Sequence, residues 1–372
     1  MRVLITGGAG FIGSHLARRL HQDGHEVVVL DSLLPQVHGD APQPDLPECE
    51  TVWADVRDAK ELSEAMKGVE VVHHFAAETG VGQSQYEIGR YVSTNTYGTA
   101  VVLEAAVAAG VRQFVLASSR AVYGEGQYHC PRCGYTFVAD GRRASAMDAS
   151  VWEIPCKRCN EPSVSLPMKE DVMPAPTSIY GITKHQQEQL ARSVSLTREM
   201  PATILRFFNV YGPGQSLRNP YVGVLGTFFR RALAGLPLEV YEDGLMLRDF
   251  VFVEDVVEAL RLCTGDERTF GQTLNVGYGE AVTLLEVAAE VFRALNLESH
   301  IHISGRYRLG DIRHAVADVS RLQTVTGFRP RTSFAEGLRL YLAWALEHQV
   351  DAGDAVADSE LAARNLLRQG RR

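Results

Sequence analysis

The chain has 372 residues, of which 45% are apolar and 22% charged, and its formal net charge is −8. This length and composition are typical of a globular protein with one large or two ordinary domains. The acidic balance excludes a whole-protein field that attracts nucleic acid, and no apolar run reaches the ~18 residues of a membrane span. No export signal is recognisable, so we expect a cytoplasmic protein with no nucleic-acid or membrane partner.

Short apolar runs alternate with helical patterns along the first 120 residues. Strands are expected at 3–5, 26–30, 52–55, 69–75 and 113–118, and helices at 11–22, from 56 to 66 and at 94–109. Strands that are apolar throughout, separated by helices, are typical of a parallel sheet covered on both faces. The pattern predicts an α/β fold with a Rossmann-like, doubly wound sheet.

This alternation breaks at residues 128–165, which are rich in Cys, Pro, Arg and Ser and show no clear period. Helical periodicity returns at 178–198. Beyond it, strands are expected at 203–208, 238–241 and 249–253, and helices at 223–233, 284–295 and 334–347. The last twenty residues are polar and rich in alanine, which indicates a surface helix or a frayed tail.

A glycine motif follows the first expected strand directly. TGGAGFIG, residues 6–13, spaces Gly7, Gly10 and Gly13 evenly and opens the first helix. Glycine lets the backbone approach a pyrophosphate, and the helix amino terminus supplies free N–H groups for it. Asp31 ends the second strand, where a carboxylate can bind ribose hydroxyls and would repel a 2′-phosphate. The sequence therefore predicts a site for NAD and not for NADP.

Tyr180 and Lys184, in the string YGITK, lie four residues apart and so share one face of the expected helix. A nearby ammonium favours the phenolate and lowers a phenol pKa that starts near ~10. Such a tyrosine can take a proton from a sugar hydroxyl as hydride leaves the same carbon. Ser119, in SSRAVYG at the end of the fifth strand, can hydrogen-bond the reacting oxygen. Together the three residues predict a catalytic site.

Several further motifs occur in one order with those above: HHFAAE at 73–78, NTYGT from Asn95, LRFFNVYGPG at 205–214 and RDFVFVEDV at 248–256. In this order the chain resembles the extended short-chain dehydrogenase/reductases of the NAD-dependent nucleotide-sugar epimerase/dehydratase family. The resemblance covers roughly residues 1–345. It implies an enzyme that binds NAD and a nucleoside-diphosphate sugar, and a homodimer paired through the helices at 94–109 and 178–198.

The resemblance also implies site residues. Tyr180 is the base, Lys184 binds the nicotinamide ribose and tunes Tyr180, and Ser119 positions the substrate oxygen. The implied cofactor contacts are Gly7, Gly10, Phe11, Ile12, Gly13, Asp31, Asp55, Val56, Ala76, Ala77, Asn95, Ser118, Tyr180 and Lys184. The implied substrate contacts are Ser119, Tyr180, Asn209, Arg248 and Arg308. The two arginines would clamp the diphosphate. The alternative for each is a surface salt bridge, since Asp249 adjoins Arg248.

These assignments divide the chain into four expected parts. An NAD-binding Rossmann domain spans 1–212, and an insertion at 128–162 lies within it. A smaller, mainly nucleotide-sugar-binding domain follows at 213–345, and a C-terminal helix or tail at 346–372.

The residues after Ser119 discriminate between reactions. Family members that eliminate water place an Asp-Glu pair there, whereas this chain has Arg120 and Ala121. Without that acid and base, dehydration lacks its chemistry, and 4-epimerisation through transient oxidation at C4 is favoured. A 4-ketoreductase is the nearest alternative, and a dehydratase or decarboxylase of the family a more distant one. A non-catalytic protein that only senses a dinucleotide is the remaining alternative, but it would not need Ser119, Tyr180 and Lys184 to be intact. LLPQVHG after Asp31, with the cysteine insertion, is similar to epimerases of dTDP-6-deoxyhexoses such as dTDP-L-rhamnose.

Two C-x-x-C pairs, Cys130/Cys133 and Cys156/Cys159, lie in the insertion. Four thiolates in two such pairs fit tetrahedral zinc, or iron in its place, and four protein ligands leave no open position, so the metal would be structural. Free thiols or local disulfides are the alternative, and disulfides are not expected without export. We therefore expect a zinc-ribbon-like insertion that forms a rigid flap over or beside the substrate cleft.

Overall fold

The computed structural model describes residues 1–39, 46–217, 219, 223–348 and 354–371. Its centre is a seven-stranded sheet in the order β14-β9-β5-β4-β1-β2-β3, and every neighbouring pair is parallel. The strands are β1 (Arg2–Thr6), β2 (Glu26–Asp31), β3 (Glu50–Trp53), β4 (Val71–His74), β5 (Gln113–Ser119), β9 (Ala202–Phe207) and β14 (Thr273–Val276). The strand order reverses between β1 and β4, which confirms the predicted doubly wound α/β fold.

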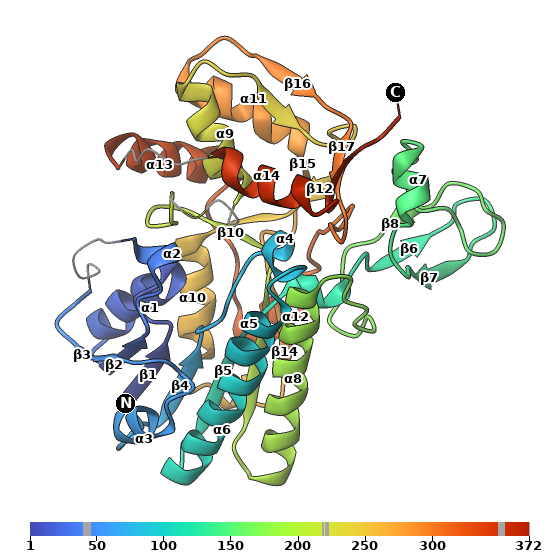
Figure 1. Cartoon of the computed structure of the whole chain (residues 1–372). Coiled ribbons are helices and arrows are strands. Elements are labelled where there is room, and N and C mark those ends of the chain that lie inside the picture. The colour runs from blue at the N-terminus through green and yellow to red at the C-terminus, as the bar shows by residue number, and fades with distance from the viewer. Residues whose placement is uncertain (40–45, 218, 220–222, 349–353, 372) are drawn as a thin grey trace.

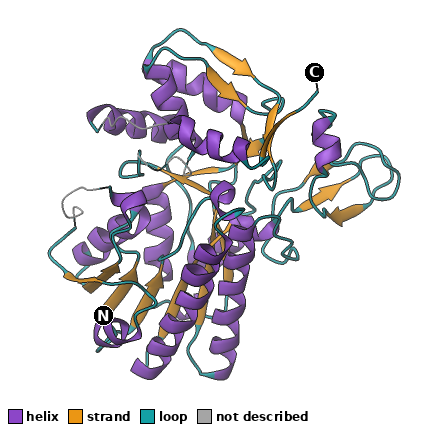
Figure 2. Cartoon of the chain, viewed as in Figure 1, coloured by secondary structure: helices purple, strands orange, loops and turns teal. Residues whose placement is uncertain are grey.

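Helices cover both faces of the sheet (Figures 1 and 2). Successive residues of β1 point to opposite faces, so Val3 and Ile5 enter one apolar core and Leu4 enters the other. The first core lies under α1 (Phe11–Gln22), α10 (Val253–Cys263) and α12 (Ser320–Thr326). The second lies under α3 (Ala59–Ala65), α6 (Gly98–Ala109) and α8 (Ile179–Thr197).

A smaller layer follows in the second half of the chain and carries its own apolar core. Its helices are α9 (Val224–Leu233), α11 (Leu284–Leu295) and α13 (Phe334–Glu347). Short two-stranded pairs join them: β10 (Asn209–Tyr211) with β13 (Phe250–Phe252), β11 (Leu238–Val240) with β16 (Ile301–Ile303), and β12 (Leu247–Arg248) with β15 (Val282–Thr283). This layer stands beyond the carboxyl ends of the sheet strands (Figure 1).

Short elements connect these layers, among them α2 (Pro35–His38), α4 (Val81–Ser84), α5 (Ile88–Tyr91) and the 3-10 turns η2 (Arg120–Tyr123) and η3 (Glu267–Thr269). Some expected bounds need correction: the strand expected at 69–75 begins at Val71, and the helix expected from 56 to 66 spans Ala59–Ala65. The third strand begins and ends two residues earlier than the predicted 52–55, so Asp55 lies in the turn after it. The helix expected at 94–109 begins as a π-helical stretch, η1 (Val92–Tyr97), before α6.

The cysteine-rich insertion forms a small antiparallel sheet in the order β7-β6-β8. Its elements are β6 (Gln127–His129), β7 (Thr136–Val138), α7 (Ala144–Asp148) and β8 (Val164–Ser165). It projects sideways from the body of the molecule (Figure 1). Strands of two or three residues are too short to give a readable period, which explains why no pattern predicted them.

The C-terminal segment contains the expected helix, α14 (Asp354–Ala363), but it does not end as a frayed tail. It continues as β18 (Leu367–Gln369), which pairs antiparallel with β17 (Arg306–Arg308). The Arg371 N–H donates to the Asp148 carbonyl of the insertion at 2.8 Å. None of the helices in the described ranges is long and apolar enough to cross a membrane.

Two adjacent histidines of β4 are enclosed in the fold, His73 and His74. The His74 ring nitrogens lie 2.7 Å from Thr6 Oγ1 and 2.8 Å from Thr99 Oγ1. The His73 Nε2 lies 3.0 Å from Thr264 Oγ1. Burial lowers the pKa of each histidine to about 3.

The folded protein therefore keeps both rings neutral at a pH where the unfolded chain protonates them. Each ring adds stability that is present above pH ~6.5 and is lost at about 1.4 kcal/mol per pH unit as the pH falls toward 3. We expect His73→Leu to reduce the loss of unfolding free energy between pH 7.5 and 5 by about 2 kcal/mol, measured by urea denaturation. Exposed His21→Leu is the control. An unchanged pH dependence in the His73 variant would contradict the assignment.

Candidate active site

The glycine motif forms the turn between β1 and α1. Gly7 has φ +68°, and a Cβ there would lie 2.7 Å from the Ala76 backbone nitrogen. A Cβ on Gly13 would lie 2.4 Å from the Gly7 carbonyl oxygen. Gly10 caps α1 without a side chain, which leaves the first N–H groups of the helix open toward solvent or a ligand. The backbone therefore provides an anion site of the kind that a pyrophosphate requires.

A cavity of about 420 Å³ opens at this turn, where the strand order reverses. Its lining includes all but one of the predicted cofactor residues: Gly7, Gly10, Phe11, Ile12, Gly13, Asp31, Asp55, Val56, Ala76, Ala77, Ser118, Tyr180 and Lys184. Ser119 lies on the same lining. The residues that were assigned to NAD from separate motifs are thus brought together around one space, which fits a dinucleotide.

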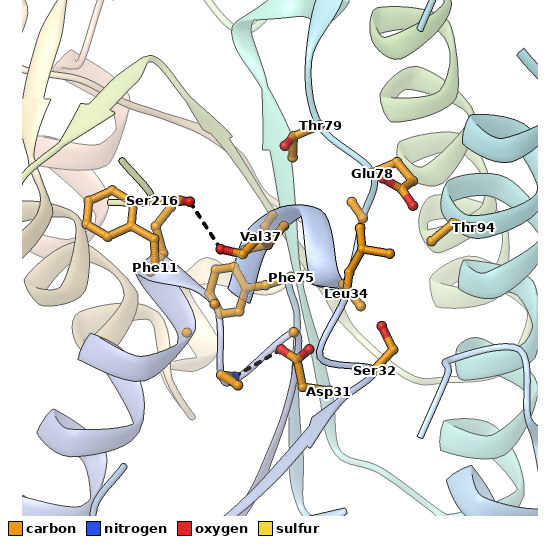
Figure 3. Close-up of a pocket in the computed structure, with 18 of the residues that line it drawn as sticks. Phe11, Asp31, Ser32, Leu34, Val37, Phe75, Glu78, Thr79, Thr94 and Ser216 are labelled. Carbon is orange, nitrogen blue, oxygen red and sulfur yellow. Dashed lines mark hydrogen bonds between the residues drawn. The ribbon is translucent and has the colours of Figure 1, made fainter. Parts of the chain in front are cut away.

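Asp31 stands at the end of β2, as predicted (Figure 3). One carboxylate oxygen accepts the Ala9 N–H at 3.1 Å, and the other accepts the Leu33 N–H at 2.9 Å. Each oxygen of a carboxylate can accept a second hydrogen bond. The side chain can therefore still bind ribose hydroxyls on the cavity side while the backbone holds it in place.

Asn95 is the predicted cofactor residue that does not line this cavity. Its side chain is fully buried, its Oδ1 accepts the Glu78 N–H, and its Nδ2 donates to the Glu78 carbonyl and to Thr183 Oγ1. Asn95 thus ties the loop after β4 to α8. It positions residues of the lining and is not itself part of it.

One wall of the cavity is not predicted by the motifs. Residues of α2 lie on the lining together with Gly214, Gln215, Ser216 and Asn219, and the Ser216 hydroxyl donates to the Val37 carbonyl at 3.1 Å (Figure 3). This contact joins segments far apart in the chain, which no local pattern encodes. The string LLPQVHG, residues 33–39, contains α2 and is the local signal for this wall.

Tyr180 lies in the first turn of α8, where the Ser178 hydroxyl caps the helix by accepting the Gly181 N–H. The Tyr180 N–H donates to Ser84 Oγ at 3.1 Å. Burial raises the pKa of the Tyr180 phenol, while a hydrogen bond with the Ser119 hydroxyl and the charge of Arg120 lower it. The phenol and the Ser119 hydroxyl are thus adjacent, as a base and a positioning group need to be.

Lys184 follows one turn later on α8 and is 4% exposed. Its ammonium donates to the Ala117 carbonyl at 2.9 Å. Burial lowers the pKa of Lys184 to about 7, against the charge of Glu188, which raises it. The expectation that Lys184 lowers the pKa of the Tyr180 phenol is not met: burial outweighs the opposing effects and raises that pKa, and the cation that acts against the rise is Arg120.

A second cavity, of about 260 Å³, adjoins the first. The linings meet between consecutive residues, because Ser119 faces the first cavity and Arg120 the second. The predicted substrate residues Asn209, Arg248 and Arg308 all line the second cavity. The predicted substrate contacts therefore divide between two adjoining spaces, with the reactive hydroxyls at their boundary.

The two arginines differ in their partners. Arg248 is 5% exposed and donates to the carbonyls of Leu247, Ile312 and Arg313. The alternative of a surface salt bridge with Asp249 is wrong, because the Asp249 carboxylate accepts three backbone N–H groups elsewhere. Arg308 does form an ion pair, at 2.9 Å, with Asp358 of α14.

The side-chain amide of Asn209 has a hydrogen-bond acceptor that is available to a ligand. Its side-chain Oδ1 is buried and has no hydrogen-bond partner among the residues that the structure describes. A buried acceptor without a partner is unfavourable unless a ligand donates to it. The position of Asn209 on the second cavity fits such a ligand.

The four predicted metal ligands meet at one point. The sulfur atoms of Cys130, Cys133, Cys156 and Cys159 all lie within 4.8 Å of one another. Three of the S···S separations are 3.5, 3.6 and 3.6 Å. Four thiolates about 2.3 Å from a central zinc ion lie about 3.8 Å apart, so the geometry fits tetrahedral coordination.

Both knuckles have the same backbone form. The Gly134 N–H donates to the Cys130 carbonyl, and the Asn160 N–H donates to the Cys156 carbonyl, each at 2.9 Å. Gly134 and Asn160 both adopt positive φ, at +68° and +60°. The glycine of the first knuckle and the asparagine of the second are residues that tolerate this conformation.

The insertion does not form a flap over either cavity, since none of residues 128–162 lies on the two linings. It instead contacts residues that directly follow the lining residue Asp311 in the chain. The Glu153 carboxylate accepts from the Arg313 guanidinium at 2.6 Å and lies 3.0 Å from the His314 ring. These contacts fix the segment that carries Arg308 and Asp311 to the lining.

Comparisons with known proteins agree with this geometry. The dTDP-L-rhamnose 4-epimerase of Burkholderia thailandensis is 37% identical over 92% of this chain and 94% of its own length. The UDP-N-acetyl-alpha-D-glucosaminuronate decarboxylase of Bacillus cytotoxicus is 30% identical over 94% of this chain and 99% of its own.

Among solved structures, MoeE5 in complex with UDP-glucuronic acid and NAD aligns with a TM-score of 0.76 and 33% identity, over 94% of this chain and 100% of that one. UDP-glucose 4-epimerase from Thermotoga maritima, with UDP-glucose, aligns with a TM-score of 0.77 and 27% identity, over 94% and 99%. A model of the NAD dependent epimerase/dehydratase family matches residues 3–139 and 159–277, and so passes over part of the insertion. With its glycine turn, its Ser119, Tyr180 and Lys184 around one cavity and this match, the chain belongs to the NAD-dependent epimerase/dehydratase family.

Proposed function

We propose that this chain is an NAD-dependent nucleotide-sugar 4-epimerase that acts on a dTDP-6-deoxyhexose such as dTDP-L-rhamnose. The observation that carries the proposal is the boundary between the cavities, where Ser119 and Tyr180 meet and Arg120 stands in place of an acid. The similarity to the Burkholderia thailandensis enzyme supports the choice of sugar.

The residues at this boundary have complementary tasks. Bound NAD supplies the hydride acceptor and donor. Tyr180 takes the proton from the C4 hydroxyl and gives it back after the 4-keto sugar has turned its other face, and Ser119 holds the reacting oxygen by a hydrogen bond. Asn209 and Arg248 hold the remainder of the substrate in the second cavity. The role of Lys184 is to bind the nicotinamide ribose from the same helix.

The alternatives differ in the groups or reagents that they need. Dehydration needs an acid and a base after Ser119, and η2 begins with Arg120 and Ala121. A 4-ketoreductase could use the same residues but would consume reduced cofactor in proportion to product. Decarboxylation is the other alternative activity, because one relative that is 30% identical is named a decarboxylase.

The test is an incubation of the purified protein with a panel of dTDP-, UDP- and GDP-sugars without added NAD. We expect the C4 epimer of at least one dTDP-6-deoxyhexose, identified by NMR of the released sugar nucleotide. A 4-keto-6-deoxy product, or turnover only with added reduced cofactor, would contradict the proposal.

Tyr180→Phe removes the proposed base and leaves the ring in place. We expect kcat to fall by roughly 10² to 10⁴, as for loss of a general base, while the NAD content of the purified protein stays unchanged. Tyr135→Phe, in the insertion and away from both linings, is the matched control. Retention of more than a tenth of the wild-type kcat in the Tyr180 variant would rule out its role as the base.

We further propose that Cys130, Cys133, Cys156 and Cys159 bind one structural zinc ion. All four positions of a tetrahedral ion are then occupied by protein.

A homodimer is proposed as well: α6 and α8 lie side by side at one edge of the molecule (Figure 1), and Tyr97, Ile182 and Leu196 are exposed there. The cytoplasmic location and the four domain boundaries stay predictions.

The zinc proposal makes a prediction that separates the metal from the chemistry. Cys133→Ser should reduce bound zinc and raise KM for the sugar nucleotide several-fold, because the insertion supports the segment of Arg308 and Asp311. Bound NAD and kcat should change little, since no insertion residue lies on the first cavity. Zinc content is measured by mass spectrometry and KM by initial rates, with Cys49→Ser as control. Unchanged kinetics and stability after metal loss would count against this support.

A further inference from the structure

Arg120 is the residue at the junction of the two cavities whose role the family assignment leaves open. It is the first residue of η2, which follows β5 without a break. The Ser119 hydroxyl accepts the Ala121 N–H at 3.2 Å, and this contact holds the turn in place. The Arg120 side chain is half-buried and lies on the lining of the second cavity.

The guanidinium of Arg120 makes no hydrogen bond or ion pair with any residue in the described ranges. Other enclosed arginines of this chain have protein partners: Glu188 binds Arg206 at 2.7 Å, Glu242 binds Arg142 and Arg313 at 2.8 and 2.9 Å, and backbone carbonyls bind Arg248. A cation that is partly removed from water and has no partner is less favourable than a paired one. Arg120 is therefore a positive group left available to the cavity.

The charged groups near Arg120 indicate that its missing partner is an anion. Burial and the positive charge of Arg248 lower the pKa of Arg120 to about 10, and Asp311 partly offsets them. Asp311 lies on the same lining but forms no ion pair with Arg120 or Arg248 within the part of the chain that the structure describes. The positive charges of Arg120 and Arg248 thus repel each other at one cavity. An anion bound between them would offset this repulsion.

The position of Arg120 also restricts which part of a substrate can supply that anion. Arg120 adjoins Ser119 in the chain, and its charge acts on the Tyr180 phenol, so it is near the reacting carbon. Arg248, on the other side, belongs to the predicted diphosphate clamp. Among the anionic groups of a nucleoside-diphosphate 6-deoxyhexose, the phosphate that carries the sugar is the one nearest to the reacting carbon. The Arg120 guanidinium can bind phosphate oxygens through paired, charge-assisted hydrogen bonds. The terminal nitrogens of Arg248 already donate to backbone carbonyls, so Arg248 contributes mainly its positive charge.

We propose that Arg120 is a substrate-binding residue that, together with Arg248, binds the sugar-linked β-phosphate of the nucleoside diphosphate. This inference rests on the proposed use of a nucleoside-diphosphate sugar. In this proposal a guanidinium group stands at the position where dehydrating relatives carry an acid. Its contact with the phosphate holds the sugar beside Tyr180. A carboxylate on the sugar is the other source of an anionic oxygen at this place, and the experiment separates the two.

The test measures equilibrium binding to the NAD-loaded protein by calorimetry, with dTDP, dTMP and UDP-glucuronic acid as ligands. It compares wild type with Arg120→Met, which removes the charge, and Arg120→Lys, which keeps the charge and loses the planar fork. Arg112→Met, whose side chain is 72% exposed, is the matched control. Because binding is read without turnover, the result does not depend on whether the protein epimerises a sugar.

We expect Arg120→Met to weaken dTDP binding by about 10- to 100-fold, the size of a lost charge-assisted contact, and to change dTMP binding by less than about twofold. Arg120→Lys should fall between Met and wild type, and it keeps the test readable should the Met variant fail to fold. Unchanged dTDP binding, or an equal loss for dTDP and dTMP, would overturn the proposal. A loss confined to UDP-glucuronic acid would overturn it in favour of a sugar carboxylate.

Discussion

The site depends on one buried ion pair, in which Arg206 of β9 binds Glu188 of α8 through two hydrogen bonds of 2.8 and 2.7 Å. Glu188 also accepts the Ser118 hydroxyl of β5 at 2.6 Å, and Arg206 lies over the Tyr123 ring of η2. Removal of one partner from such a pair leaves an uncompensated buried charge, at a cost of about 3–5 kcal/mol. The pair therefore fixes α8 to the two strands and the turn that surround the reacting position.

A second set of buried contacts fixes the same helix from its other side. Gln187 of α8 donates to Thr99 Oγ1, and that hydroxyl lies 2.8 Å from a ring nitrogen of His74. Tyr180 and Lys184 are thus carried by a helix that is held through two consecutive residues, Gln187 and Glu188, to α6 and to the strands β5 and β9. Preorganisation of this kind allows a phenol and a hydroxyl to act on a bound sugar without rearrangement. The second cavity combines residues of α4, α9 and α14 with residues of loops and short strands, and it is in the loops that relatives with different sugars would be expected to differ.

The parts of the molecule that could be predicted from the sequence are those determined by residues close together in the chain. The strand–turn–helix at the amino terminus, the shared face of Tyr180 and Lys184 and the paired knuckles each depend on residues a few positions apart, and the structure brings each set together. The features that local sequence did not predict depend on distant contacts. Asn95 reads like any polar residue near a site, yet its amide is consumed by Glu78 and Thr183. The partner of Arg308 lies fifty positions away in a segment whose composition suggested a loose end.

The C-terminal segment gives the second cavity an unusual construction. Asp358 of α14 reaches Arg308, β18 completes a sheet with β17, and the backbone beyond β18 is bonded to the insertion at Asp148. One wall is therefore shared by three stretches that are remote in the chain. An exchange of sugar preference between relatives cannot proceed by transplanting one of these stretches alone, because each is shaped by the other two. A working chimera would have to import the metal-binding module, the β17 region and the closing helix and strand as a single unit.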